Sequence, residues 1–176
     1  MNRMSQVGSF AVVLLTAMNS SRTPALTVAT ATHIIREKGA SGALRQFYED
    51  DRQWPQLLHG IATGRTSWLD IANELQPASD AGARVQLQFA VGEALEHRPA
   101  NVLRIALPIF GMSVCGGPDV DDSRFDSYEL SIRAIDKRKR TLAQVQSSSL
   151  HLVRDRCIQE LESSKSGIAR FYGRGK

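Results

Sequence analysis

Hydrophobic residues recur at helical spacing over residues 51–77, which is the stretch with the clearest periodicity in the chain. The first half carries them at Trp54, Leu57, Leu58, Ile61 and Ala62, and the second half at Trp68, Ile71, Ala72 and Leu75. Both sets follow the i, i+3, i+4, i+7 pattern that places side chains on one helical face. The pattern therefore predicts two short helices in succession, neither of which can bury its apolar stripe alone.

Local signals mark where these two helices begin and end. Gly64 is suited to end the first helix with a left-handed backbone, and Ser67 with Asp70 matches a capping box that opens the second. Asp51 is the candidate N-cap of the first helix, which places Pro55 in the first turn, where its missing N–H is tolerated. The stretch reads as one helical hairpin.

The rest of the chain shows the same period and no strand-like alternation. Gly39 and Gly42 predict a break between two N-terminal helices, and Gly92 predicts a close approach by another element. The run at 101–110 is apolar almost all round, which is typical of a buried central helix. Together the patterns predict an all-α fold, either an antiparallel helical bundle or a short HEAT-like helical stack of six to eight helices. Besides the hairpin, the expected helices cover 33–38, 41–48, 80–96, 101–110, 126–146 and 150–161, with Asp126 and Glu129 as the capping box of the long one.

The chain of 176 residues is divided by composition into three parts. Residues 1–31 resemble an export signal, with Arg3 near the start, an apolar run at 10–18 and the small-x-small cleavage pattern Ala29-Thr30-Ala31. Thr23-Pro24-Ala25 is a second candidate cleavage site, and the alternative interpretation is a cytosolic protein whose first helix is apolar. A single helical domain is expected over 32–162, followed by a flexible basic tail at 163–176.

The two cysteines, Cys115 and Cys157, are candidates for a disulfide. Cys115 precedes a Gly-Gly-Pro turn, and Cys157 shares an apolar stripe with Leu150 and Leu161 in the last helix. A bridge would suit an exported protein and would tie the end of the core to that helix. The alternative is a pair of buried free thiols.

Charge gives only a mild signal. The chain has 22 Lys and Arg against 18 Asp and Glu, a net charge of +4, and without residues 1–31 two Arg are lost and the net charge is +2. The one basic cluster, Arg133, Lys137, Arg138 and Arg140 with Lys139 among them, is a candidate binding face for phosphates or an acidic partner. The alternative interpretation is a solvated face near a helix C-terminus.

Motifs for catalysis, metal binding and cofactor binding are absent from the sequence. His33, His59, His97 and His151 do not occur at zinc-binding spacing, and the aspartates at 119–126 do not match a calcium loop. We therefore predict no enzyme activity, no metal and no cofactor. A hydrolase using His59 or His97 near Glu93 or Glu96 is a further alternative.

The run WPQLLHGIATGRTSWLDIANELQP, then AVGEALEHRPANVLRIAL and the two cysteines, resembles small exported α-helical proteins of Gram-negative bacteria with no assigned function. Their helices stack in a HEAT-like way, and the resemblance covers roughly residues 40–160. The resemblance carries over no catalytic residue. The stacked short helices, the candidate disulfide and the missing catalytic motifs predict a periplasmic or secreted helical module that binds another protein, of an immunity or inhibitor type or an envelope-assembly type. The alternative function is a cytosolic nucleic-acid-binding protein that uses the basic face from Arg133 to Arg140.

Overall fold

The computed structural model describes residues 25–174. Counting the short turns α5, η2 and α6 as one broken helix, these residues form seven helical segments and no strand, which confirms the predicted all-α fold of six to eight helices. The elements are α1 Val28–Tyr48, α2 Gln53–Ala62, α3 Thr66–Leu75, η1 Gln76–Ala78, α4 Ala81–Ala94, α5 Pro99–Asn101, η2 Val102–Ala106, α6 Leu107–Phe110, η3 Met112–Cys115, η4 Ser123–Phe125, α7 Tyr128–Ala143, η5 Ser148–Leu150 and α8 His151–Phe171.

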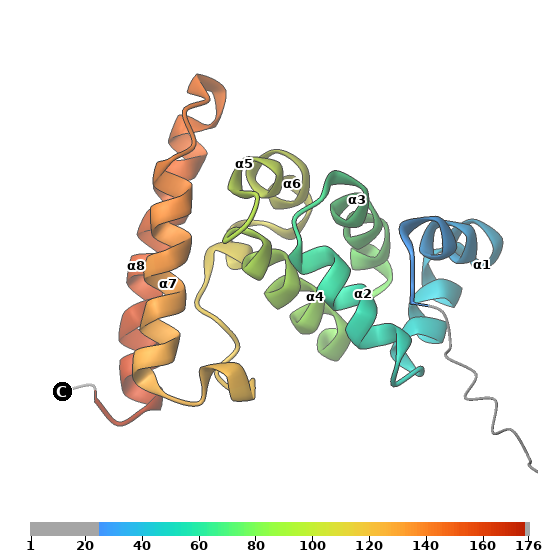
Figure 1. Cartoon of the computed structure of the whole chain (residues 1–176), viewed down its shortest axis with the longest axis horizontal. Helices are drawn as coiled ribbons and strands as arrows, with labels where there is room; N and C mark the ends of the chain where they lie inside the picture. The colour runs from blue at the N-terminus through green and yellow to red at the C-terminus, as the bar shows by residue number, and fades with distance from the viewer. Residues whose placement is uncertain (1–24, 175–176) are drawn as a thin grey trace, which may run out of the picture.

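The segments from α1 to α6 stack in two layers (Figure 1). In one layer α1 packs on α3, and α3 packs on η2, while in the other layer α2 packs on α4. Packing of alternate helices is the arrangement of α-solenoids, so the stack rather than the bundle describes this part of the chain. The α7–α8 hairpin closes one end of the stack and stands at a steep angle to it (Figure 1).

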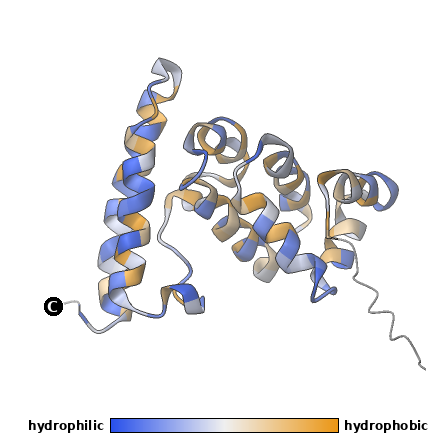
Figure 2. Cartoon of the chain, in the orientation of Figure 1, coloured by the Kyte–Doolittle hydropathy of each residue, from blue (hydrophilic) through white to orange (hydrophobic). Residues whose placement is uncertain are grey.

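The core runs continuously through the stack and into the hairpin. Apolar residues alternate with polar ones along every long helix in Figure 2, and the apolar ones include fully buried side chains from each layer, such as Phe47, Leu57, Leu69 and Leu87. Polar side chains also join neighbouring helices. The indole Nε1 of Trp54 donates to Gln86 at 2.7 Å and thereby links α2 to α4.

The predicted hairpin of residues 51–77 is present as α2 and α3, but its caps differ from those expected. Gly64 has the predicted left-handed backbone, with φ of 67°. The helix-opening carboxylate is Asp50 rather than Asp51, because the Asp50 Oδ1 accepts from the backbone N–H of both Arg52 and Gln53 at 2.9 Å. Helix α3 begins at Thr66 without a side-chain cap, so the predicted Ser67–Asp70 capping box is wrong.

Gly60 allows α2 and α3 to pack closely. A Cβ at Gly60 would lie 2.6 Å from Cε2 of the Trp68 ring, which is itself 7% exposed and cannot move outward freely. We expect Gly60→Ala to lower the free energy of unfolding by about 2 kcal/mol, as overpacking of a filled core does. Gly167→Ala is the matched control, because Gly167 lies within α8 with open space around it. Urea denaturation should find this control unchanged or slightly more stable.

The N-terminal boundary predicted at residue 31 conflicts with the start of α1. The Thr27 side chain caps α1 by accepting from the Thr30 N–H at 3.1 Å, and Ala31 is fully buried. Cleavage after Ala31 would therefore remove the cap and first turn of a core helix. The predicted break in this region is confirmed at Gly39, where φ is 69°. The apolar run at 10–18 lies outside the described residues.

The apolar segment 101–110 does not form one regular helix. It is divided into the single turn α5, the π-helical turn η2 and the short α6, and Pro108 in α6 has no N–H to donate to the preceding turn. Most of its apolar residues are buried as expected, but Ile109 is 48% exposed.

The last two helices differ from expectation at their ends. The cap of α7 is Ser127, whose hydroxyl accepts from the Leu130 N–H at 3.3 Å, and not Asp126. Helix α8 continues to Phe171, so the flexible tail predicted from residue 163 is wrong over 163–171. Packing against α7 and η4 accounts for the added length of α8, because α8 lies along α7, Ile168 is buried and the Tyr172 hydroxyl donates to the Phe125 carbonyl of η4.

Candidate functional site

A cleft of about 440 Å³ lies between α2 and α4 on one side and the 116–127 loop on the other. Its lining combines six apolar residues with seven polar or charged ones, a mixture typical of binding sites. The lining residues are Pro55, Leu58, His59, Ala62, Gln86, Phe89, Ala90, Glu93, Asp119, Asp122, Arg124, Phe125 and Arg138.

Helical periodicity places the first two walls. In α2 the lining residues recur at i, i+3, i+4 and i+7 from Pro55, and in α4 they do so from Gln86. Residues at this spacing share one face of a helix. Since α2 and α4 pack against each other, the two faces form one continuous surface.

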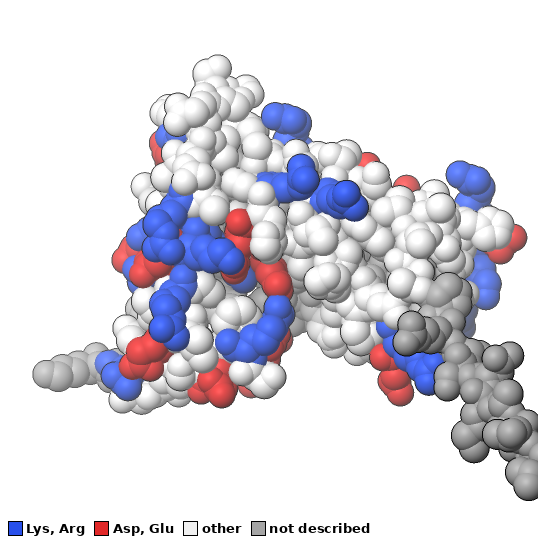
Figure 3. All heavy atoms as spheres, in the orientation of Figure 1, with Lys and Arg blue, Asp and Glu red and all other residues white. Residues whose placement is uncertain are grey.

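The 116–127 loop is attached to this surface by Arg124. Its Nη1 and Nη2 donate to the two carboxylate oxygens of Glu93 at 2.8 and 2.9 Å, across a sequence separation of 31 residues. The same guanidinium donates to Asp122, with Nη2 at 2.8 Å from Oδ2. Acidic and basic side chains gather on the hairpin and beside the boundary between hairpin and stack (Figure 3).

These contacts shift the pKa values of Asp122 and Arg124. Hydrogen bonding from Arg124 holds the pKa of the Asp122 carboxyl below its usual range, and hydrogen bonding to Glu93 raises the pKa of Arg124. The contribution of Asp122 to stability is therefore complete above the pKa of an unfolded aspartate. It is lost as the pH falls through the lowered pKa of the folded state.

Arg138 forms the back of the cleft. It is only 2% exposed, and its Nε donates to Glu96 at 3.3 Å while its Nη1 donates to the Gly116 carbonyl at 3.2 Å. Burial lowers the pKa of Arg138, and the charge of Glu96 opposes that shift. Its Nη2 makes no hydrogen bond to any of residues 25–174, although Arg138 lines the cleft.

Three of the four residues of the predicted basic face are exposed, and the fourth is buried. Arg133, Lys137 and Arg140 are exposed, as expected, and the Lys137 ammonium lies 2.8 Å from Glu96. Including Arg138 in this face is wrong, because its side chain points into the interior. The periodicity of α7 gives the reason, since residue 138 lies three positions after the buried Ile135 and four before the buried Leu142. That spacing was a signal in the sequence for the role of Arg138.

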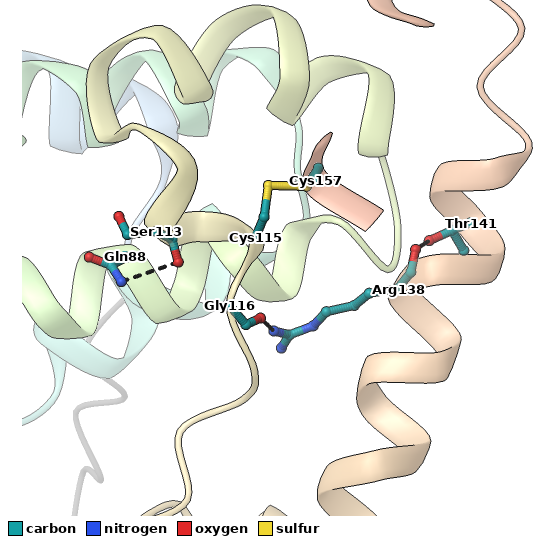
Figure 4. The surroundings of a disulfide bond; sticks show 7 residues. All are labelled: Gln88, Ser113, Cys115, Gly116, Arg138, Thr141 and Cys157. Carbon is teal, nitrogen blue, oxygen red and sulfur yellow. Dashed lines mark hydrogen bonds between the residues drawn. A yellow bond between two sulfur atoms is a disulfide. The ribbon is translucent and has the colours of Figure 1, made fainter. Parts of the chain in front are cut away.

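Cys115 and Cys157 form a disulfide, with a Cα–Cα distance of 5.1 Å, as predicted. Figure 4 shows the bridge joining η3 to α8, with the Arg138 side chain reaching the Gly116 carbonyl beside it. Both sulfurs belong to fully buried residues. The disulfide and Arg138 therefore hold the start of the 116–127 loop from two directions.

The histidines are placed differently from one another. His33 and His151 form exposed i, i+4 pairs with Glu37 and Asp155. His59 lines the cleft near Glu93, but within the described residues it makes no hydrogen bond or ion pair. A general base requires an orienting partner and a positioned nucleophile. His59 therefore has the polar surroundings that the hydrolase hypothesis requires. Within residues 25–174 it lacks the second requirement, a carboxylate that is hydrogen-bonded to the imidazole.

Over residues 25–174, no group of three or more His, Cys, Asp or Glu side chains is arranged to hold a metal ion. No helix in the same range has the length and apolar character needed to cross a membrane. Comparison of the chain with protein-family models, curated proteins and solved structures gives no match.

Proposed function

We propose that this chain is an exported, non-enzymatic module that binds a segment of another protein in the cleft between α2, α4 and the 116–127 loop. The observation that carries the proposal is the Arg138 guanidinium at the back of a cleft with mixed apolar and polar walls, where Nε and Nη1 are hydrogen-bonded and Nη2 has no acceptor among the described residues. A donor that faces a cleft and has no protein acceptor can form a hydrogen bond with a ligand.

The composition of the cleft supports a protein ligand. Its aromatic side chains, Phe89 and Phe125, and its arginines, Arg124 and Arg138, belong to the residue types that are enriched at protein interfaces. The cleft volume is sufficient for one or two side chains of a partner. An immunity, inhibitor or envelope-assembly role agrees equally with such a site.

The test is photo-crosslinking from inside the cleft. A photoreactive phenylalanine analogue at Phe89, which lies on the cleft wall, is expected to form one discrete protein adduct in intact cells. The matched control is the same analogue at Ile109, an apolar residue that is 48% exposed and lies outside the cleft. Adducts of equal yield at both positions, or none at Phe89, would contradict the proposal.

Export is supported by the disulfide and by the signal-like pattern that precedes the described residues. Disulfides persist in oxidising compartments such as the periplasm. Because Thr27 and Ala31 belong to α1 and its cap, the site consistent with an intact fold is Thr23-Pro24-Ala25. The mature protein would then begin at Leu26, whose N–H donates to the side chain of Gln56.

We expect native protein from fractionated cells to have the mass of residues 26–176, increasing by two hydrogen masses on reduction. Intact mass spectrometry with and without reductant measures both. Full-length, reduced protein recovered from the cytosol would contradict export, whereas a mass that begins at residue 32 would contradict only the choice of cleavage site.

Nucleic-acid binding through Arg133, Lys137 and Arg140 has less support. One of its four expected contributors, Arg138, is buried, and Lys137 is already paired with Glu96. We expect no DNA or RNA binding at low salt. Binding that weakens steeply with added salt and with Lys137→Ala plus Arg140→Ala would favour this alternative.

A further inference from the structure

We infer that the partner segment inserts a basic side chain, preferably arginine, into the cleft, where it replaces Arg124 at Glu93 and Asp122, and that its backbone carbonyl accepts from Arg138. This inference rests on the proposed function and specifies the chemistry of the partner. Three features of the described residues support it: the charge of the cleft, the way in which Arg124 is held, and the free donor of Arg138.

The first feature is an excess of negative charge. The lining carries the carboxylates of Glu93, Asp119 and Asp122 and the guanidiniums of Arg124 and Arg138, so three negative charges against two positive charges leave one negative charge. Glu96, outside the lining, is shared between Arg138 and Lys137 and does not change this balance. Asp119 has no ion pair among residues 25–174, and its Oδ1 accepts only from the nearby Asp121 N–H. A cation is the complementary ligand.

The second feature is that Arg124 already occupies a site for a guanidinium. Its guanidinium donates hydrogen bonds to both carboxylate oxygens of Glu93 and to Asp122. Its Cζ lies 5.4 Å from the centre of the Phe125 ring. This bidentate and aromatic environment is the one that proteins use for arginine. The Arg124 side chain is 58% exposed, so its ion pairs contribute little to stability and can be exchanged at small cost.

The third feature indicates which chemical group of the ligand lies next to its cation. The Nη2 of Arg138 has no acceptor among the described residues and can donate to a ligand. A carboxylate brought to it would be repelled by the negative charge of the lining. A backbone carbonyl supplies the acceptor without a charge. The ligand that satisfies both requirements is a polypeptide segment with a basic side chain close to an accessible carbonyl.

The probe for the test is the blocked tripeptide acetyl-Gly-Arg-Gly-amide, titrated into the mature protein while backbone amide shifts are followed by NMR. We expect shifts confined to the cleft walls, and none with the citrulline or glutamate versions of the peptide. Arg124→Ala removes the internal competitor and should tighten binding about three- to fivefold. Asp119→Asn keeps the Oδ1 acceptor and should weaken binding about threefold, whereas the exposed Asp70→Asn on α3 should leave it unchanged.

Two results would overturn the inference. One is weaker binding in Arg124→Ala, because that would make Arg124 a contact for the ligand and not its competitor. The other is equal or better binding of the citrulline or glutamate peptide. In either case a discrete adduct from the crosslinker at Phe89 would still support a protein-binding cleft, so failure of the inference is distinguished from failure of the proposed function.

Discussion

Replacing both cysteines, Cys115→Ala together with Cys157→Ala, is expected to lower the free energy of unfolding by about 4 kcal/mol. The bridge spans a sequence separation of 42 residues, and the chain-entropy relation for a loop of that length gives this value. Both residues are fully buried, so the loss of their packing adds to the effect. A loss of this size is a substantial part of the total stability of about 5–15 kcal/mol that is typical of a domain.

The position of the bridge in the fold explains why the effect should be large. Helices α7 and α8 pack mainly against each other, and they meet the stack through η3, α5 and η4. The disulfide joins η3 directly to α8 and is a covalent cross-link between stack and hairpin in addition to the 116–127 loop. Without it, the hairpin is held by the contacts of α8 with η3, by those of α7 with α5 and η4, and by a few polar contacts.

Urea denaturation of the double variant beside the oxidised and reduced wild-type protein measures this contribution. The reduced wild type should fall close to the variant. Leu152→Ala is the control, because Leu152 is 74% exposed on α8 and should change the stability by less than about 0.5 kcal/mol. A loss below about 1 kcal/mol in the double variant would show that the packing of η3 alone fixes the hairpin.

The sequence predicted the helices well because their periodicity is local. It was less successful at helix caps, where neighbouring acidic or hydroxyl residues compete and the choice depends on where the chain turns. Asp50 and Asp51 stand next to each other, as do Asp126 and Ser127, and in each pair the residue not chosen is the cap in the structure. The prediction of a flexible tail was wrong over 163–171 for another reason. Its composition is that of a flexible segment, but α7 offers a surface on which Ile168 is buried.

The cleft could not be predicted from the sequence because long-range packing creates it. Glu93 and Arg124 are 31 residues apart, and only the path of the 116–127 loop brings them together. The inward position of Arg138 could have been predicted from the sequence, since the helical period of α7 places residue 138 on the buried face. Its charge favoured a surface interpretation, because unpaired arginines are seldom buried. The partner, Glu96, lies 42 residues earlier on another element.

Arg138→Ala is the second substitution expected to have a large effect, lowering the free energy of unfolding by about 3 kcal/mol or more. It leaves the 10% exposed side chain of Glu96 without its buried partner and the Gly116 carbonyl without a donor, and it opens a cavity where the arginine stem was packed. Lys137 still faces Glu96 at 2.8 Å and limits the loss. Thermal and urea denaturation measure the effect, with Arg140→Ala on the same helix as an exposed control.

The double substitution Arg138→Met with Glu96→Gln separates the stabilising role of Arg138 from its proposed role in binding. Methionine fills most of the volume and glutamine removes the charge that would otherwise be left unpaired, so we expect this variant to regain at least half of the stability lost in Arg138→Ala. If Arg138 supplies a hydrogen bond to the partner, the recovered fold should still bind the arginine tripeptide several-fold more weakly than the wild-type protein. A variant that regains stability and binds the tripeptide normally would make Arg138 a structural residue only, and the acceptor site of the cleft would then have to lie elsewhere.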